Sequence, residues 1–252
     1  MLSSGLAYAS SLPASTWAIL IVAAAATGIA KTALPGAATL AVALFAAVLP
    51  AKESTGTMLV LLLIGDVLAI WMYRHDADWS ELRRLVPGVL AGVMLGAVFL
   101  HLVSDEAARR LIGALLLALI AATLVLMRLP EPPEVQGPLG RAIYGTAAGF
   151  TTMAANAGGP VTTMYFLASR FSVMAFLGTT AWFFFTVNLV KLPLSIGLGL
   201  IRPETLWVDL VLVPVVIVSA LAGRWLAARM DKRIFDPLVT ILTVASAAHL
   251  LV

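Results

Sequence analysis

The chain has 252 residues, of which 61% are hydrophobic and 12% are charged, with a net charge of +3 and a mean hydropathy of +1.02. Soluble domains contain about 45–50% apolar and about 25% charged residues, so the composition excludes a soluble domain and indicates a polytopic membrane protein. The lack of cysteine excludes disulfides, thiolate metal sites and palmitoylation. The basic balance is expected to set membrane topology rather than to bind nucleic acid.

Apolar segments of helical length follow one another along the whole chain. They span residues 16–30, 37–49, 55–73, 85–102, 109–127, 141–155, 160–169, 174–196, 204–222 and 235–252. Runs of this length favour an all-α bundle over a β-barrel, whose strands are shorter and alternate. The segments on either side of 31–36 and 156–160 fall short of the roughly 20 residues that a perpendicular helix needs. We expect them to be tilted crossings or re-entrant half-helices.

Two interruptions break the apolar pattern. The first reads Lys31-Thr-Ala-Leu-Pro35-Gly36 and the second Asn156-Ala-Gly158-Gly159-Pro160. Lys31 is the only charge between Met1 and Pro50, and a cation near the bilayer centre costs roughly 2.5–3.5 kcal/mol on insertion scales. Broken helices and buried charge are tolerated in a membrane where they line a protected polar site. We therefore predict that both interruptions face such a site near the midplane.

The two halves of the chain resemble each other. A proline-rich joint at residues 129–140 separates a first repeat, residues 1–128, from a second, residues 141–252. An offset of 122 residues pairs Gly56 with Gly178 and Asp66 with Asn188. Five segments per half would invert the second repeat relative to the first. Inverted repeats with broken helices at matching positions are typical of secondary transporters, although recurring small residues also serve helix packing alone.

Basic residues give an independent prediction of topology. With the N-terminus outside, ten of the 16 lysines and arginines fall in inside loops and four in outside loops. The inside set is Arg74, Arg83, Arg84, Arg128, Arg141, Arg170, Arg224, Arg229, Lys232 and Arg233. Because basic residues are enriched in cytoplasmic loops, both termini are predicted to lie outside.

The interruptions predict an anion site. Half-helices that begin after Pro35 and at Pro160 would direct unpaired N–H groups and positive dipole ends at a ligand. Lys31 would add charge, while Thr32 and Asn156 would add hydrogen bonds. The alternative is a pair of kinks without a ligand. The predicted substrate-binding residues are Lys31, Thr32, Pro35, Gly36, Asn156, Gly158, Gly159, Pro160, Asn188 and Lys191.

Two further charged residues lie within predicted spans. Lys191 shares a helical face with Asn188 and precedes Pro193, so it either lines the exit path or extends to the interface. Asp66 is the only acid well inside the spans of the first half. Such a carboxylate is a predicted proton carrier, with a lysine partnership or a packing role as alternatives.

Other chemistry has no support in the sequence. The histidines, His75, His101 and His249, lack metal-ligand spacing. No nucleotide-binding phosphate loop and no catalytic constellation occurs. We therefore expect no metal, no cofactor and no enzymatic activity.

The order of these patterns resembles the sulfite exporter TauE/SafE family of bacterial and archaeal membrane proteins, from about Trp17 to Leu251. The resemblance rests on the first interruption, on Ala51-Lys-Glu-Ser-Thr-Gly-Thr57, on Tyr73-Arg-His-Asp-Ala-Asp-Trp79, on the small-residue helix Leu85–Gly96, on Gly149-Phe-Thr-Thr through Gly158-Gly159-Pro160, and on Gly178-Thr179. It implies export of small sulfur-containing anions, such as sulfite or organosulfonates.

These observations lead to one functional hypothesis. We expect a secondary transporter of the cytoplasmic (inner) membrane that exports a small oxyanion by alternating access, with Lys31 as countercharge and Asp66 in proton coupling. The inside-negative voltage alone favours anion export by about 2.3 kcal/mol per charge per 100 mV. A passive anion channel and an importer of another small anion are the alternatives. The expected partners are the anion, the lipid bilayer and, in a homodimer, a second copy of the chain.

Overall fold

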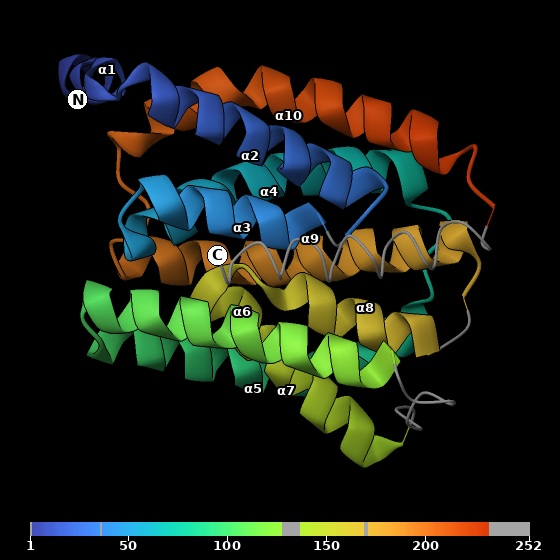
Figure 1. The fold of residues 1–252 in the computed structure, drawn as a ribbon. Helices are drawn as coiled ribbons and strands as arrows, with labels where there is room; N and C mark the ends of the chain where they lie inside the picture. Colours follow the sequence, from blue (N-terminus) through green and yellow to red (C-terminus); the bar gives the residue numbers. More distant parts are fainter. Residues whose placement is uncertain (1, 36, 128–136, 169–170, 232–252) are drawn as a thin grey trace.

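The computed structural model describes residues 2–35, 37–127, 137–168 and 171–231, and these residues form helices and no strand (Figure 1). The helices are α1 (Leu2–Ser11), α2 (Ala14–Thr32), α3 (Ala37–Val48), α4 (Ala51–Tyr73), α5 (Trp79–Leu102), α6 (Asp105–Met127), α7 (Pro138–Ala155), α8 (Gly158–Ala168), α9 (Val173–Gly197) and α10 (Thr205–Ala227). Five of these described helices, α2, α4, α5, α9 and α10, are long and apolar enough to cross a membrane. The protein is an all-helical, multi-pass membrane protein.

The predicted segments correspond to α2 through α10, with differences at their starts. Helices α4, α5 and α6 begin four to six residues earlier than predicted, because their first turns are polar and the apolar pattern misses them. In α5 the Asp78 side chain caps the helix by accepting a hydrogen bond from the Glu81 N–H at 3.1 Å. Helix α1 was not predicted. The segment 235–252, Gly36 and most of the joint at 129–140 lie outside the described residues.

Both predicted interruptions are real breaks between helices. Helix α2 ends at Thr32, and α3 begins at Ala37. Helix α7 ends at Ala155, where Asn156 adopts the left-handed conformation with φ 53° and ψ 21°. Asparagine is one of the few non-glycine residues that enter this region readily. The chain therefore turns within two residues and begins α8 at Gly158.

The helices form a bundle with a central pair. Helices α4 and α9 pack together in the middle, with the shorter α3 and α8 beside them (Figure 1). Helix α2 packs along α10 on one side, and α5 packs along α7 on the other. The centre of the bundle thus contains both helix breaks.

The α5–α7 contact is a close approach of two backbones at glycines. A Cβ atom on Gly92 would lie 2.1 Å from the Thr146 carbonyl oxygen, and one on Gly149 would lie 2.1 Å from the Val89 carbonyl oxygen. Small residues at such positions let membrane helices associate through van der Waals packing, since lipid gives no hydrophobic driving force between helices. This seam fixes α5 against α7.

Replacing Gly92 by isoleucine should therefore separate α5 from α7. We expect Gly92→Ile to destabilise the purified protein by about 1–3 kcal/mol, the usual cost of overpacking, seen as a lower melting temperature in detergent. Gly113 in α6 is the matched control, because a Cβ there meets nothing within 4 Å. Equal melting temperatures for Gly92→Ile and Gly113→Ile would contradict the proposed seam.

Candidate functional site

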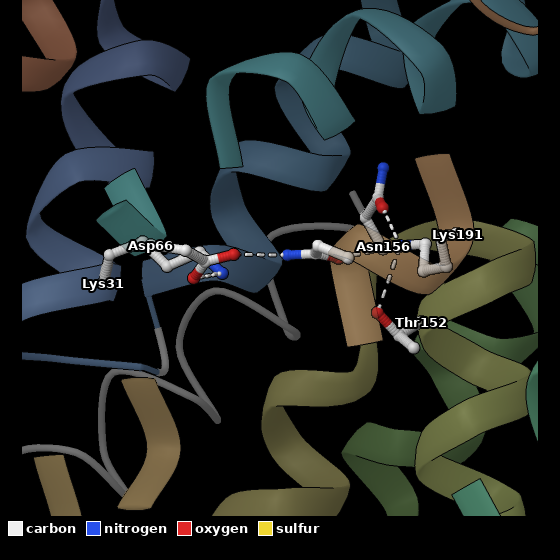
Figure 2. A network of polar contacts seen from close by, with 6 residues as sticks. Lys31, Asp66, Thr152, Asn156 and Lys191 are labelled. Atoms are coloured by element: carbon white, nitrogen blue, oxygen red, sulfur yellow. Dashed lines mark hydrogen bonds and ion pairs between the residues drawn. The ribbon is translucent and has the colours of Figure 1, made fainter. Parts of the chain in front are cut away.

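A buried ion pair joins the first helix break to the central helix pair. The Lys31 ammonium on α2 lies 2.6 Å from Asp66 Oδ1 on α4, with side chains only 7% and 0% exposed (Figure 2). The other carboxylate oxygen, Oδ2, accepts a hydrogen bond of 2.7 Å from Asn188 Nδ2 on α9. The Lys31 ammonium also lies 4.5 Å from the centre of the Phe184 ring, a favourable cation–π distance. Three helices are thereby fixed at one point.

A second lysine continues this network on the other side of Asn188. Lys191 on α9 is fully buried, and its ammonium donates to Asn156 Oδ1 at 2.6 Å, to Asn188 Oδ1 at 3.2 Å and to Thr152 Oγ1 at 3.3 Å (Figure 2). The alternative that Lys191 extends to the membrane interface is therefore wrong. Three acceptor oxygens match the three donors of a protonated ammonium.

The orientation of both amides is fixed by their other partners. Asn188 donates its Nδ2 to a carboxylate, and Asn156 donates its Nδ2 to the Thr55 carbonyl at 2.9 Å. Since a carboxylate and a carbonyl accept only, each amide must turn its oxygen towards Lys191. Among the described residues no carboxylate pairs with this ammonium. The network therefore contains two lysines and one aspartate, and one of the two lysines has no acidic partner among the described residues.

A small cavity of about 20 Å³ lies within this network. Its lining residues are Ala30, Lys31, Pro35, Ala38, Leu62, Asp66, Thr152, Asn156, Gly159, Thr180, Ala181, Phe184 and Asn188. Both helix breaks reach the cavity, and a Cβ on Gly159 would lie 3.4 Å from the Pro35 carbonyl oxygen. The two interruptions, more than 100 residues apart in sequence, thus meet at one site.

Two hydroxyl groups beside the cavity were not predicted as site residues. Thr180 Oγ1 is buried without a hydrogen-bond partner among the described residues. Thr152 Oγ1 accepts from Lys191, which leaves its own proton free to donate. Thr152 belongs to the Gly149-Phe-Thr-Thr pattern and Thr180 follows Gly178-Thr179, so the signals were present without a reason to prefer these threonines over their neighbours.

The remaining predicted site residues are placed as follows. Thr32 lies outside the cavity lining, because its hydroxyl donates to the Gly28 and Ala220 carbonyls at 3.1 and 2.8 Å. Its own carbonyl accepts from the Tyr73 hydroxyl at 2.7 Å. Gly158 and Pro160 are buried at the start of α8 but do not line the cavity. Gly36 lies outside the described residues.

The described residues contain no group of three or more histidine, aspartate and glutamate side chains that could hold a metal ion. Asp209 on α10 is buried, and neither of its carboxylate oxygens has a hydrogen-bond partner in the described part of the chain. It does not line the cavity. The polar chemistry near the cavity therefore consists of ammonium, amide and hydroxyl donors around one paired carboxylate.

A helical membrane bundle with buried lysines and an ion pair between two broken helices is typical of a membrane transporter. Comparison with protein families gives the particular one: residues 20–250 match the model of the sulfite exporter TauE/SafE family. The chain belongs to this family, which is one of membrane exporters of the sulfite or sulfonate type. No curated protein and no solved structure matches the chain.

Removing the carboxylate of the buried pair should destabilise the fold. Asp66→Asn leaves Lys31 buried without its partner, and breaking such a pair costs about 3–5 kcal/mol. In the double variant Lys31→Met/Asp66→Asn no unpaired charge is added, so we expect most of the lost stability to return. Melting temperatures of the four proteins in detergent form a double-mutant cycle. Additive losses in the double variant would show that the pair contributes no coupling.

Proposed function

We propose that this protein is a secondary transporter that exports small sulfur-containing oxyanions, such as sulfite or an organosulfonate, by alternating access. The observation that supports this most directly is the Lys191 ammonium, which is fully buried with neutral partners only. An unneutralised buried charge is costly, and a bound anion would remove that cost. Family membership supports the sulfur oxyanion as its chemical class.

The proposed anion site uses donors from both halves of the chain. The anion would take hydrogen bonds from the Lys31 ammonium and from the hydroxyls of Thr152 and Thr180, all of which line the cavity. Lys191 would supply the additional positive charge next to the cavity, through its hydrogen bonds to Thr152 and Asn156. The breaks at Pro35 and Gly159 let the backbone approach the anion.

The size of the cavity supports a carrier cycle rather than an open channel. At about 20 Å³ it holds roughly one water molecule, so an oxyanion cannot bind without rearrangement. The described structure is then a closed state between an inward-open and an outward-open one. On each side of the site, such a carrier needs a contact that can break and so open the site to that side of the membrane.

Two similar clusters, one at the start of α4 and one at the start of α5, are suited to this role. On one side of the cavity, the Glu53 carboxylate at the start of α4 accepts a hydrogen bond from the Tyr8 hydroxyl and lies 3.6 Å from Arg202 Nη1. Burial and the neighbouring carboxylate raise the pKa of the Tyr8 phenol, so it remains a donor at neutral pH. The Glu53 carboxylate is only 6% exposed. We call this the Glu53 gate.

On the other side of the cavity, Glu81 at the start of α5 also contacts a tyrosine hydroxyl and arginine side chains. It accepts from the Tyr165 hydroxyl and lies 3.5 Å from Arg141 Nε and 3.4 Å from Arg84 Nη1. These partners come from α5 itself (Arg84), α7 (Arg141) and α8 (Tyr165), whereas those of Glu53 come from α1 and the α9–α10 connection. We call this the Glu81 gate. Separating either cluster would open the cavity to one side only.

The inverted repeat predicted from sequence fits this proposal. Helix α2 leads into a break and packs on α10, while α7 leads into a break and packs on α5. The repeat-related residues Asp66 and Asn188 are hydrogen-bonded to each other. A pseudo-twofold axis through this contact would relate α4 to α9 and place the anion between the repeats, as in other secondary transporters.

Asp66 would couple transport to protonation. In the described structure it pairs with Lys31, so an incoming anion would compete with a carboxylate already in place. Protonation of Asp66 would release the ammonium to the anion. Voltage alone also favours outward movement of an anion from the cytoplasm, so protonation would set the affinity of the site rather than provide the whole driving force.

We place the protein in the cytoplasmic membrane of a bacterium or archaeon, with both termini outside. The described inside residues, such as Arg83 and Arg229, lie at the Glu81 end of the bundle, whereas Arg202 lies at the Glu53 end. By the positive-inside rule the Glu81 gate faces the cytoplasm.

Lys191→Gln should weaken anion transport while keeping a hydrogen-bonding side chain in place. Hydrogen bonds to charged groups contribute about 1.5–3 kcal/mol, so we expect the KM for labelled sulfite in everted vesicles to rise roughly 10–100-fold. Lys52→Gln is the matched control, because Lys52 binds the Val103 carbonyl at the Glu53 end. A Lys191→Gln variant with the KM of the parent would overturn the proposed site, and flux that does not saturate would favour a channel.

The gates can be tested because the chain contains no cysteine. Ala181 lines the cavity and is 3% exposed, so Ala181→Cys introduces a single thiol at the site. We expect slow labelling by a membrane-impermeant thiol reagent in this parent. Adding Glu81→Gln should raise labelling from the cytoplasmic side, and adding Glu53→Gln should raise it from the outside.

The decisive measurement is the side of the membrane from which thiol labelling increases. A gate variant that raises labelling equally from both sides, or from neither, would contradict the assignment of the two clusters. The melting temperature of each variant serves as the control for unfolding, because an unfolded protein exposes the thiol to both sides.

A further inference from the structure

An open apolar groove of about 250 Å³ lies between α5 and α9, away from the proposed anion site. Its walls are apolar side chains of both helices, and Trp79, Val86 and Leu90 on its rim are 43–45% exposed. Arg83 is the only charged residue in its lining. The groove therefore has apolar walls and one cationic side chain.

The groove exists because α5 packs closely on α7 rather than on α9. Gly92 brings the α5 backbone against Thr146, and the contact between α5 and α9 is much less extensive. Because the opposite face of α5 is fixed by this seam, side-chain movement alone cannot close the gap. The groove is open at its rim, where apolar side chains are exposed, so in a membrane its natural occupant is an apolar chain.

The chemistry at one end of the groove identifies the occupant. The rings of Trp79 and Trp182 lie with centroids 4.8 Å apart, and the Trp182 N–H donates to the Arg74 carbonyl at 3.4 Å. Tryptophan is enriched at the level of lipid headgroups, which places this end at the membrane interface. Arg83 lies in the same turn of α5 as Leu82, is exposed, and has no ion-pair partner among the described residues. Its neighbour Arg84 is already paired with Glu81.

We propose that this groove binds one anionic glycerophospholipid from the leaflet at the Trp79 end of the bundle. An acyl chain lies in the groove along α5 and α9, and the phosphate contacts the Arg83 guanidinium beside the tryptophan pair. Basic side chains between membrane helices recognise anionic headgroups through this combination of charge and apolar surface. The proposal does not depend on which solute the protein transports.

The test measures lipid binding directly on the purified chain. Stabilisation of the melting temperature is titrated with dioctanoyl phosphatidylglycerol and with dioctanoyl phosphatidylcholine, since a ligand that binds the native state raises it. We expect the parent to bind the anionic lipid roughly five-fold more tightly than the zwitterionic one. Arg83→Gln should remove this preference, whereas Arg229→Gln should keep it. Arg229 is the matched control because it is an exposed arginine at the same end, 4.1 Å from the Trp225 ring.

A second pair of variants fills the groove itself. Val86→Trp and Leu90→Trp place bulk on the open side of the groove, and both should abolish stabilisation by either lipid while leaving the lipid-free melting temperature close to that of the parent. Unchanged lipid stabilisation in these variants would overturn the proposal. So would an Arg83→Gln variant that retains the anionic preference. A groove that holds a second copy of the chain predicts instead that Val86→Trp converts a dimer to a monomer without any lipid effect, and this result would also overturn it.

Discussion

The Lys31–Asp66 ion pair is the interaction on which the rest of the structure depends. Removing two charges from water costs several kcal/mol for each ion, and the attraction between them offsets this only with good geometry and further hydrogen bonds. The pair satisfies that condition through Asn188, whose amide donates to the free carboxylate oxygen. The contact therefore requires α2, α4 and α9 to meet at one depth. Both helix breaks are held beside it, because Pro35 and Gly159 line the same cavity.

In the proposed site, the excess of one lysine over carboxylates is what would attract an anion to this structural contact. A single ion pair would leave the centre of the bundle electrically neutral, so the site would not attract an anion. The second ammonium, on Lys191, changes the balance without bringing its own counter-ion. Its partners are amide and hydroxyl oxygens, which disperse the charge but cannot cancel it. Since Asn188 contacts both Lys191 and Asp66, a change in the charge of either group is transmitted to the other through one side chain. In the proposed mechanism, anion binding and the protonation state of Asp66 would be coupled for this reason.

Much of this arrangement could be predicted from the sequence, and the part that could not has a physical reason. The two interruptions were found because proline, glycine and a lone lysine contrast sharply with the surrounding apolar run. The offset that pairs Asp66 with Asn188 indicated equivalent positions, and these turn out to touch. Lys191 was ambiguous, because spacing along a helix gives neither its depth nor its rotation relative to Asn156 and Thr152. Thr180 was missed because only the folded structure shows that its hydroxyl has no partner. The sequence could not show that the Thr32 hydroxyl bonds to the Ala220 carbonyl instead of lining the cavity, since this bond depends on α10, nearly two hundred residues away in sequence.

The two sides of the bundle differ in how closely their helices pack, and the proposed alternating cycle would use this difference. If α4 and α9 are related by inversion, then the α4–α10 contact corresponds to the α9–α5 contact. The first is closed, with a Cβ on Gly65 within 3.9 Å of Val216, while the second contains the groove of about 250 Å³. Two related repeats would pack alike in a symmetric state. In the proposed cycle, closing the α5–α9 contact and opening the α4–α10 contact would convert the described arrangement into the opposite one. The lipid acyl chain that we propose for the open contact would stabilise the described arrangement over the other. Transport would then respond to the composition of the surrounding leaflet, because the lipid and the moving helix compete for the same space.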